Sequence, residues 1–344
     1  MQTKSMVWTA LFCLVLAPTL WGGNFVVGSF VAAELHGIWA NLLRWCAALL
    51  VLLPICGPTA WRHRRDLHLG WRRLTILGLL GVAGFNSVLY SALHHASVTA
   101  AAIAFAVTPF FIIGLSSVLD RQWPRRRMLV ASAVAMMGVA LAQANALLSD
   151  ISVLGVVLVL LAALTWAAYC VAMKRLPVNA PASATFLAQV LLGTLLLVPL
   201  ALAFPAPQLI DVSAETWLSI GYLGLGAGAL AFWLWQRAIA AVGPVSASPF
   251  MNLVPITSLF FGALFLGEQV LPVDWLAFAI VLIGIALSLT GRTPTVTATE
   301  ALPVQPFEEF RRAHKRAPKP TTVQAPEKET APERAAPEPV AEVA

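Results

Sequence analysis

Ten apolar stretches, separated by short polar segments, dominate the first 290 residues of the chain. A helix needs about 20 mainly apolar residues to cross the hydrocarbon core of a bilayer, and it satisfies its own backbone hydrogen bonds there. The pattern therefore predicts an all-α integral membrane protein with ten transmembrane helices. They are expected at residues 6–30, 38–55, 74–93, 99–119, 128–148, 153–173, 184–204, 217–239, 246–266 and 275–290.

The first apolar stretch lies close to the N-terminus, where a signal peptide is the alternative interpretation. The stretch spans residues 6–30 and is longer than the apolar core of a signal peptide, which has about 7–15 residues. No convincing small-residue cleavage site followed by a soluble domain is present. We interpret this stretch as the first membrane helix.

Two parts of the chain share landmarks at a constant spacing. A proline within an apolar stretch recurs at Pro109 and Pro255, and 255 − 109 = 146. A glycine that opens a Gly-(Val or Ile)-Ala-Leu run recurs at Gly138 and Gly284, and 284 − 138 = 146. Because both landmarks agree on one spacing, we predict that the membrane part is a duplication.

Basic residues concentrate in alternate polar segments. Arg and Lys follow the second, fourth and sixth stretches and lie near the eighth, whereas the segments after the odd-numbered stretches have none. By the positive-inside rule, this distribution places both termini in the cytoplasm. Each repeat holds five helices, an odd number, so the second repeat enters from the opposite side. We therefore predict inverted repeats at residues 1–147 and 148–291.

The composition supports a membrane protein independently. The chain is 59% hydrophobic and only 11% charged, with a mean hydropathy of +0.80, which excludes an ordinary soluble globular protein. The net charge of +6 does not indicate a nucleic-acid partner. Its excess lies in the membrane part, with 14 basic and 8 acidic residues, and membrane topology accounts for its placement in loops.

The last segment, residues 292–344, has a different composition. It is rich in Pro, Ala, Glu and Lys and holds 8 basic and 8 acidic residues. Such a segment buries too little apolar surface to offset its chain entropy, so we expect a disordered cytoplasmic tail. Its basic cluster at residues 311–316 either rests on anionic membrane lipid or stays solvated.

The order of these elements resembles a known family. A proline in a helix of small residues is followed by Gly267 and Glu268 and then by the Gly-Ile-Ala-Leu helix, and a similar order occurs in the first half. This repeated order is similar to the EamA-type branch of the drug/metabolite transporter superfamily. The resemblance covers roughly residues 8–291, and the first half departs from it with Asp120 and Arg121 at the acidic position. It implies two inverted five-helix repeats and export of amino acids or related metabolites.

Arg44 is the residue that most strongly indicates a binding site. It lies six residues after Ile38, about 9 Å into the second helix. A charge at this depth faces a wet cavity, pairs with an acid such as Glu34, or extends its side chain to the membrane surface. The resemblance favours the cavity, because an Arg at this point is typical of the family's second helix.

A polar stripe is expected on the third helix. Asn86, Tyr90 and His94 are four residues apart, so they fall on one helical face. The stripe is a candidate lining of the transport path, with proton coupling through His94 near neutral pH. The alternative is that His94 is an ordinary interfacial histidine at the helix end.

Aromatic residues recur at related positions of the two repeats. Trp21 and Trp166 are 145 residues apart, with Asn24 and Tyr169 nearby in the same two helices. The resemblance implies that these helices line the central cavity, so the rings are a candidate stacking surface for substrate, to which Trp233 in the eighth helix is added. Helix packing is the alternative for each ring.

The two prolines and a nearby asparagine are further candidates. Pro109 and Pro255 remove backbone hydrogen bonds from the fourth and ninth helices, which predicts bends that serve gating or static shape. Asn252 lies three residues before Pro255 and either caps the freed backbone or contacts substrate. Both roles place polar groups beside the expected cavity.

The sequence has no signature of catalysis, metal binding or a cofactor. Phosphate-binding loops, nucleophile elbows and His-Glu-x-x-His motifs are absent. The four cysteines have no paired spacing and are expected to be small packing residues; they are Cys13, Cys46, Cys56 and Cys170. We therefore expect no enzyme activity, no metal site and no cofactor.

These observations together predict a secondary transporter of small polar metabolites in the bacterial inner membrane. It is expected to cross the membrane many times, contact lipid and export amino acids or related metabolites by alternating access. The alternatives are an importer of organic acids or nucleoside-like solutes, or a membrane sensor or scaffold that acts through its tail. A homodimer also stays open, because faces of small residues pack either within one chain or between two.

Overall fold

The structure is a computed structural model that describes residues 2–93, 95, 105–142, 152–267 and 269–290. All regular elements in these ranges are helical, and all lie in the compact unit that spans Met1–Pro306. The predictions for His94, for Glu268 and for the tail from residue 292 concern positions outside the described residues.

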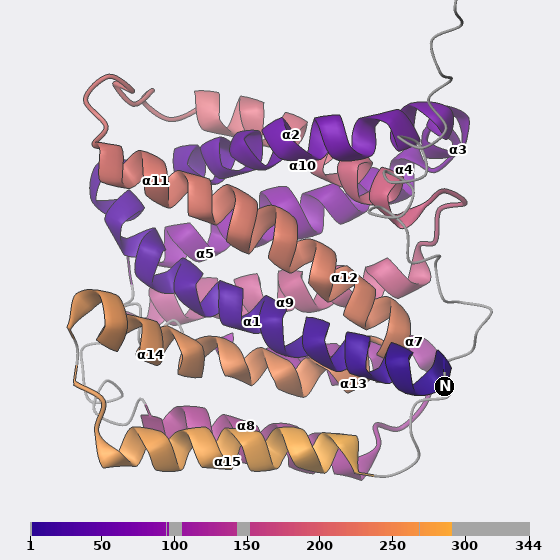
Figure 1. Cartoon of the computed structure of the whole chain (residues 1–344), viewed down its shortest axis with the longest axis vertical. Helices are drawn as coiled ribbons and strands as arrows, with labels where there is room; N and C mark the ends of the chain where they lie inside the picture. The colour runs from indigo at the N-terminus through magenta and orange to yellow at the C-terminus, as the bar shows by residue number, and fades with distance from the viewer. Residues whose placement is uncertain (1, 94, 96–104, 143–151, 268, 291–344) are drawn as a thin grey trace, which may run out of the picture. The chain divides into compact units, whose positions relative to one another are not determined.

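Among the described residues, the first half holds five helical segments and one short connecting helix, α3, and its helices are drawn in Figure 1. Its third membrane segment consists of two α-helices joined by a π-helix, labelled η1. The elements are α1 (Gln2–Glu34), α2 (Gly37–Arg62), α3 (Arg64–Leu69), α4 (Trp71–Gly78), η1 (Leu79–Gly84), α5 (Phe85–Leu93), α7 (Thr108–Asp120) and α8 (Arg126–Ala142).

The second half follows a similar order. Its third membrane segment also contains a π-helix, η3, and the next segment opens with a short α-helix and a 3₁₀-helix, η4. The elements are α9 (Val153–Arg175), α10 (Ala182–Leu202), α11 (Ala214–Tyr222), η3 (Leu223–Leu230), α12 (Ala231–Val242), α13 (Pro244–Ala247), η4 (Ser248–Asn252), α14 (Leu253–Leu266) and α15 (Pro272–Leu289).

Eight helical segments of the described residues are long and apolar enough to cross a membrane. The two remaining expected segments contain α7 and α8, which have 13 and 17 residues. The structure does not describe residues 96–104, shortly before α7, or residues 143–151, directly after α8. The structure therefore supports a multi-pass helical membrane protein, while ten spans and cytoplasmic termini stay predictions.

Helices α2 and α10 pack against each other and run in opposite directions (Figure 1). His36, just before α2, stacks on Phe204, just after α10, with ring centroids 4.4 Å apart. At the opposite end, Arg73 Nη1 donates a hydrogen bond of 2.5 Å to the Pro177 carbonyl, shortly before α10 begins. The start of each helix thus lies near the end of the other.

Both π-helices pack closely on the opposite half of the chain. A Cβ atom added at Gly81 in η1 would lie 2.6 Å from the Tyr169 ring in α9. A Cβ atom added at Gly224 in η3 would lie 2.5 Å from the backbone oxygen of Arg44 in α2. Glycine is therefore required at both positions, and π-helical segments of this kind often occur at functional sites.

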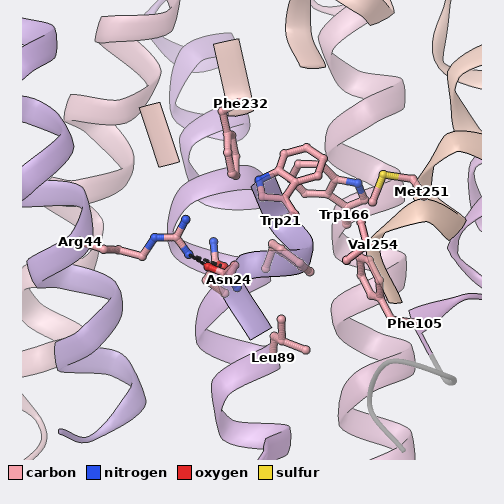
Figure 2. A pocket seen from close by; sticks show the side chains of 11 residues that line it. Trp21, Asn24, Arg44, Leu89, Phe105, Trp166, Phe232, Met251 and Val254 are labelled. Atoms are coloured by element: carbon pink, nitrogen blue, oxygen red, sulfur yellow. Dashed lines mark hydrogen bonds between the residues drawn. The ribbon is translucent and has the colours of Figure 1, made fainter. Parts of the chain in front are cut away.

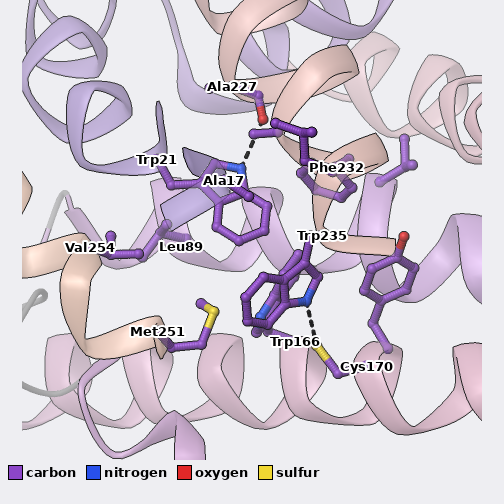
Figure 3. Close-up of a cluster of buried hydrophobic side chains, with 14 of the residues drawn as sticks. Ala17, Trp21, Leu89, Trp166, Cys170, Ala227, Phe232, Trp235, Met251 and Val254 are labelled. Atoms are coloured by element: carbon purple, nitrogen blue, oxygen red, sulfur yellow. Dashed lines mark hydrogen bonds between the residues drawn. The ribbon is translucent and has the colours of Figure 1, made fainter. Parts of the chain in front are cut away.

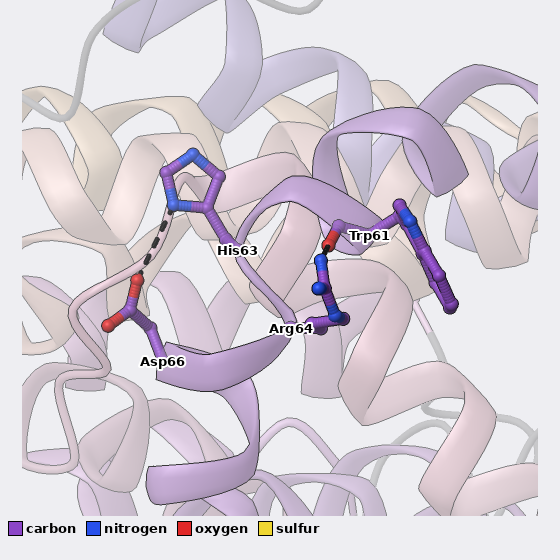
Figure 4. A network of polar contacts seen from close by, with 4 residues as sticks. All are labelled: Trp61, His63, Arg64 and Asp66. Atoms are coloured by element: carbon purple, nitrogen blue, oxygen red, sulfur yellow. Dashed lines mark hydrogen bonds and ion pairs between the residues drawn. The ribbon is translucent and has the colours of Figure 1, made fainter.

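The connection after α2 is polar and exposed (Figure 4). Arg64 Nη1 donates to the Trp61 carbonyl at 3.1 Å, and its guanidinium lies 5.0 Å from the centre of the Trp61 ring. His63 Nδ1 lies 3.5 Å from a carboxylate oxygen of Asp66. Arg and Trp side chains together are typical of a membrane–water interface.

Helices α8 and α15 lie side by side through the two glycines that marked the repeat (Figure 1). A Cβ atom at Gly284 would lie 2.6 Å from the Ala135 backbone nitrogen, and one at Gly138 would lie 2.7 Å from the Ala277 carbonyl oxygen. Small residues allow membrane helices to approach this closely. The matched landmarks at residues 138 and 284 therefore have a packing role.

We expect the Gly284→Ala substitution to lower the thermal unfolding temperature in detergent, because the added methyl group forces α8 and α15 apart. The expected loss in the free energy of unfolding is about 1–3 kcal/mol. Gly114→Ala is the matched control, since nothing lies within 4 Å of a Cβ atom added there. The control should be neutral or slightly stabilising, because alanine favours a helix more than glycine does. Equal unfolding temperatures for the two variants would contradict this packing role.

Candidate functional site

Arg44 lies inside the helical bundle and is held by three oxygen atoms. Its Nη1 donates to Asn24 Oδ1 at 3.3 Å, to Asn86 Oδ1 at 3.0 Å and to the Tyr90 hydroxyl at 3.0 Å. Only 1% of its surface is exposed. We call these four residues, from α1, α2 and α5, the Arg44 cluster; their grouping brings together candidates that the sequence placed on three different helices.

The two alternative interpretations of Arg44 do not hold. The side chain does not reach the protein surface, and no carboxylate lies within ion-pairing distance of it among the described residues. Glu34 instead accepts a hydrogen bond of 2.9 Å from the Ser213 backbone nitrogen. The side-chain hydroxyl and backbone N–H of Ser213 hold the pKa of Glu34 below its usual value.

A small cavity adjoins the Arg44 cluster (Figure 2). The volume that the centre of a water molecule can occupy in this cavity is about 20 Å³. This is enough space for about one water molecule. The walls are polar around Arg44 and otherwise aromatic or aliphatic. The lining residues are Trp21, Asn24, Arg44, Phe85, Asn86, Leu89, Phe105, Trp166, Phe232, Met251 and Val254.

Three aromatic rings from α1, α9 and α12 form one wall of the cavity (Figures 2 and 3). Trp21 lies edge-on to Trp166 and to Phe232, with centroids 5.0 and 5.6 Å apart, and Trp166 lies 5.3 Å from Phe232. The Trp21 indole donates a hydrogen bond of 2.8 Å to the Ala227 carbonyl in η3. We call Trp21, Trp166 and Phe232 the aromatic layer; its edge-to-face geometry is the favourable one for rings.

Several polar atoms of the lining residues have no hydrogen-bond partner. They are Arg44 Nε, Asn86 Nδ2 and Trp166 Nε1, and all are N–H groups buried from solvent. A buried donor without a partner costs about 1–3 kcal/mol. Among the described residues ten buried side-chain polar atoms have no partner, and these three belong to residues that line the cavity.

The structure places five of the expected binding residues in the cavity wall. These are Trp21, Asn24, Arg44, Asn86 and Trp166. Tyr90 contributes through its bond to Arg44, although it does not line the cavity.

Two other candidates, Tyr169 and Trp233, lie away from the cavity. Tyr169 packs behind Trp166, with centroids 5.2 Å apart. Trp233 stacks beneath Arg237, whose guanidinium carbon lies 4.5 Å from the ring centre. Phe232, the neighbour of Trp233, takes the lining position instead.

Asn252 and the two prolines lie at helix starts. Pro109 is at the beginning of α7, and Pro255 is the third residue of α14, directly after the 3₁₀ turn of η4. The Asn252 side chain is fully buried, and neither of its polar atoms has a hydrogen-bond partner. It therefore does not cap the backbone in this structure, and it does not line the cavity, although Met251 and Val254 do.

Six apolar lining residues were not predicted as site residues: Phe85, Leu89, Phe105, Phe232, Met251 and Val254. In the sequence they are indistinguishable from core positions, because apolar residues fill both places. A partial signal exists, since Phe105, Met251 and Val254 lie within four residues of the two prolines.

The described residues contain no group of three or more His, Cys, Asp or Glu side chains that would hold a metal ion. The cavity wall itself has one charged group, Arg44. Hydrogen-bond donors lie at one side of the cavity and aromatic rings at the other.

The EamA-like transporter family matches the chain twice, at residues 8–143 and 153–290. The chain belongs to this family. The match identifies a membrane transporter of the drug/metabolite transporter superfamily, and it agrees with the resemblance seen in the sequence. The family and its named relatives indicate a transporter and not an enzyme.

Curated relatives of this EamA-like protein are distant but cover most of it. Protein PecM of Dickeya dadantii is 27% identical over 83% of this chain and 95% of its own length. A probable amino-acid metabolite efflux pump of Salmonella typhimurium is 25% identical over 81% of this chain and 94% of its own length. The uncharacterized inner membrane transporter YedA of Escherichia coli is 23% identical over 82% of this chain and 90% of its own length.

A solved crystal structure supports the same fold. It has a TM-score of 0.66 and 19% sequence identity to this EamA-like protein, and the match covers 81% of this chain and 96% of the other.

We expect the Arg44→Met substitution to keep the unfolding temperature of the protein or to raise it. Methionine fills the space without a buried charge, and replacing buried charges with apolar groups is often neutral or stabilising. Asn86→Leu should lower the stability by about 1.5–3 kcal/mol, because it leaves the charge with fewer partners. Thermal unfolding followed by tryptophan fluorescence in detergent measures both.

Asn179→Leu, at an exposed position between α9 and α10, is the matched control for Asn86→Leu. If Arg44→Met lowers the unfolding temperature as much as Asn86→Leu does, the arginine is present for folding and not for ligand binding.

Proposed function

We propose that the protein is a secondary transporter of the bacterial inner membrane that exports small metabolites bearing a carboxylate and an apolar or ring portion. Amino acids and related metabolites are the leading class. The observation that carries the proposal is the buried Arg44 guanidinium, with no acidic partner among the described residues, at the edge of an aromatic cavity.

The geometry of Arg44 favours a carboxylate. All three of its hydrogen bonds leave from Nη1, and Nε has no partner. The Nε–Nη2 edge of a guanidinium matches the two oxygen atoms of a carboxylate, so that edge is free for a bidentate contact. Asn24, Asn86 and Tyr90 then fix the plane of the guanidinium.

The aromatic layer favours an apolar or ring portion in the substrate. Trp166 Nε1 and Asn86 Nδ2 are free donors beside the same cavity and suit further oxygen atoms of the ligand. The name of the Salmonella typhimurium relative, a probable amino-acid metabolite efflux pump, supports the same substrate class and the export direction.

Substrate entry requires the cavity to enlarge, because its present free space suits about one water. A closed cavity between two halves of a transporter is one stage of alternating access. In this proposal, the helix starts at Pro109 and Pro255 are where α7 and α14 bend to open it, because backbone there is already irregular.

Flux in proteoliposomes tests the proposal. Vesicles containing the protein are loaded with labelled L-phenylalanine or labelled phenylpyruvate, which share a ring and a carboxylate but differ in the ammonium group, with and without a pH gradient. We expect efflux of at least one compound to exceed that of empty vesicles. Arg44→Ala should lower the rate at low substrate concentration by about tenfold or more, which corresponds to a loss of about 1.4 kcal/mol or more.

The efflux rate of Arg44→Lys should lie between those of the parent and of Arg44→Ala, because lysine keeps the charge but cannot make a bidentate contact. Arg65→Ala, at an exposed position in the short connecting helix α3, is the control and should transport like the parent. A chain shortened after Gly291 should also keep its flux. Transport that survives in Arg44→Ala would contradict the proposed site, and loss of all flux on shortening would favour a role of the tail.

Acceleration by the pH gradient would support proton coupling, and His94→Ala then shows whether that residue carries it. Faster uptake than export of phenylpyruvate would instead favour the importer of organic acids.

A further inference from the structure

A second buried polar cluster lies behind the aromatic layer. Gln236 Nε2 donates a hydrogen bond of 3.1 Å to the Tyr169 hydroxyl, and the Gln189 side chain interacts with the same tyrosine. Tyr169 and Gln189 have exposed fractions of 1% and 2%. We call these three residues, from α9, α10 and α12, the Tyr169 cluster.

The members of the Tyr169 cluster occupy the positions that correspond to members of the Arg44 cluster. Trp21 and Trp166 set the spacing of the first helices at 166 − 21 = 145, and Pro109 and Pro255 set a spacing of 146. The corresponding pairs are Asn24 with Tyr169, Arg44 with Gln189 and Tyr90 with Gln236, at spacings of 145, 145 and 146.

The π-helices support this correspondence independently. Tyr90 lies six residues after the end of η1 at Gly84, and Gln236 lies six residues after the end of η3 at Leu230. Both residues therefore follow the irregular part of the third membrane segment by the same length of helix. The two clusters are built from equivalent parts of the two halves, one with a charge and one without.

The two clusters lie at different depths along the antiparallel pair α2 and α10. Arg44 is eight residues after His36, and Gln189 is fifteen residues before Phe204, which stacks on His36. These separations correspond to about 12 and 22 Å along the helix axes, so the clusters are roughly 10 Å apart in depth. The Arg44 cluster is nearer the start of α2, and the Tyr169 cluster is nearer the start of α10.

A single layer of rings separates the Tyr169 cluster from the cavity. The Tyr169 ring centroid is 5.2 Å from that of Trp166 and 6.0 Å from that of Phe232. Both of these rings line the cavity beside Arg44. If the aromatic layer moved by about the width of one ring, the cavity would therefore reach the Tyr169 cluster.

We propose that Tyr169, Gln189 and Gln236 form a second substrate site, which binds the carboxylate through amide and phenol donors when the cavity opens toward the start of α10. This inference rests on the proposed transport function. Hydrogen bonds from neutral donors are roughly half as strong as those from a guanidinium. The substrate therefore binds more tightly from the face where α2 begins and more weakly from the face where α10 begins.

Side-resolved transport kinetics test the second site. Vesicles with a single known protein orientation receive labelled L-phenylalanine or phenylpyruvate on one face or the other, and KM is measured for each face. Gln189→Leu removes the amide but keeps the size of the side chain. We expect it to raise KM by roughly five- to tenfold, as for one lost hydrogen bond, from the face where α10 begins, and to leave KM from the other face unchanged.

Arg44→Gln should give the opposite result, with KM raised mainly from the face where α2 begins. Gln208→Leu, in the exposed loop after α10, is the matched control and should change neither KM. The double variant Arg44→Gln/Gln189→Arg should reverse which face has the lower KM. Its unfolding temperature is measured first, and if it does not fold, the single variants decide.

The outcomes separate this inference from the proposed function. If the parent protein carries neither compound, the transport proposal fails and the second site fails with it. If the parent transports but Gln189→Leu changes KM equally from both faces, changes neither, or lowers only the unfolding temperature, the Tyr169 cluster is a structural network and the inference is overturned.

Discussion

A guanidinium buried among membrane helices is the constraint on which the rest of the structure depends. In surroundings of low polarity, a charge without partners costs several kcal/mol. The chain meets this cost with oxygen atoms from Asn24, Asn86 and Tyr90, all bound to one nitrogen of Arg44. These contacts join α1, α2 and α5, and they leave Nε of Arg44 without a partner in a residue that lines an aromatic cavity. A charged group held firmly but only partly satisfied is suited to receiving an anionic group of a ligand.

Close packing between the two halves keeps this arrangement in place. The π-helix η3 of the second half contacts the backbone of Arg44 through Gly224, and η1 of the first half contacts the Tyr169 ring through Gly81. Each half therefore supports the polar cluster of the other. A movement of either π-helix changes the surroundings of a cluster across the interface between the halves, which is the kind of coupling that alternating access requires.

The all-helical membrane fold and part of the candidate site were predictable from the sequence, for identifiable reasons. Apolar length predicts membrane helices, a lone arginine within one of them predicts a polar site, and the spacing of Asn86 and Tyr90 predicts a polar helix face. The structure groups these candidates with Asn24 around Arg44. The π-helices were not predicted, because a glycine-rich apolar run fits an α-helix equally well. Phe232 was missed in favour of Trp233, since the π-helix before it rotates the following helix in a way that regular spacing does not show. Gln189 was missed because a single neutral amide in a helix carries little signal until it is matched with Arg44 at the corresponding position of the other half.

The most direct test of the central claim is an experimental structure of the protein with phenylpyruvate bound. The account predicts that the carboxylate lies on the Nε–Nη2 edge of Arg44 at hydrogen-bonding distance, with the ring of the ligand against Trp166. Arg44 should keep its bonds to Asn24, Asn86 and Tyr90 in that structure. A ligand bound elsewhere, with the free edge of Arg44 still unoccupied, would contradict the claim that this arginine is the substrate anchor.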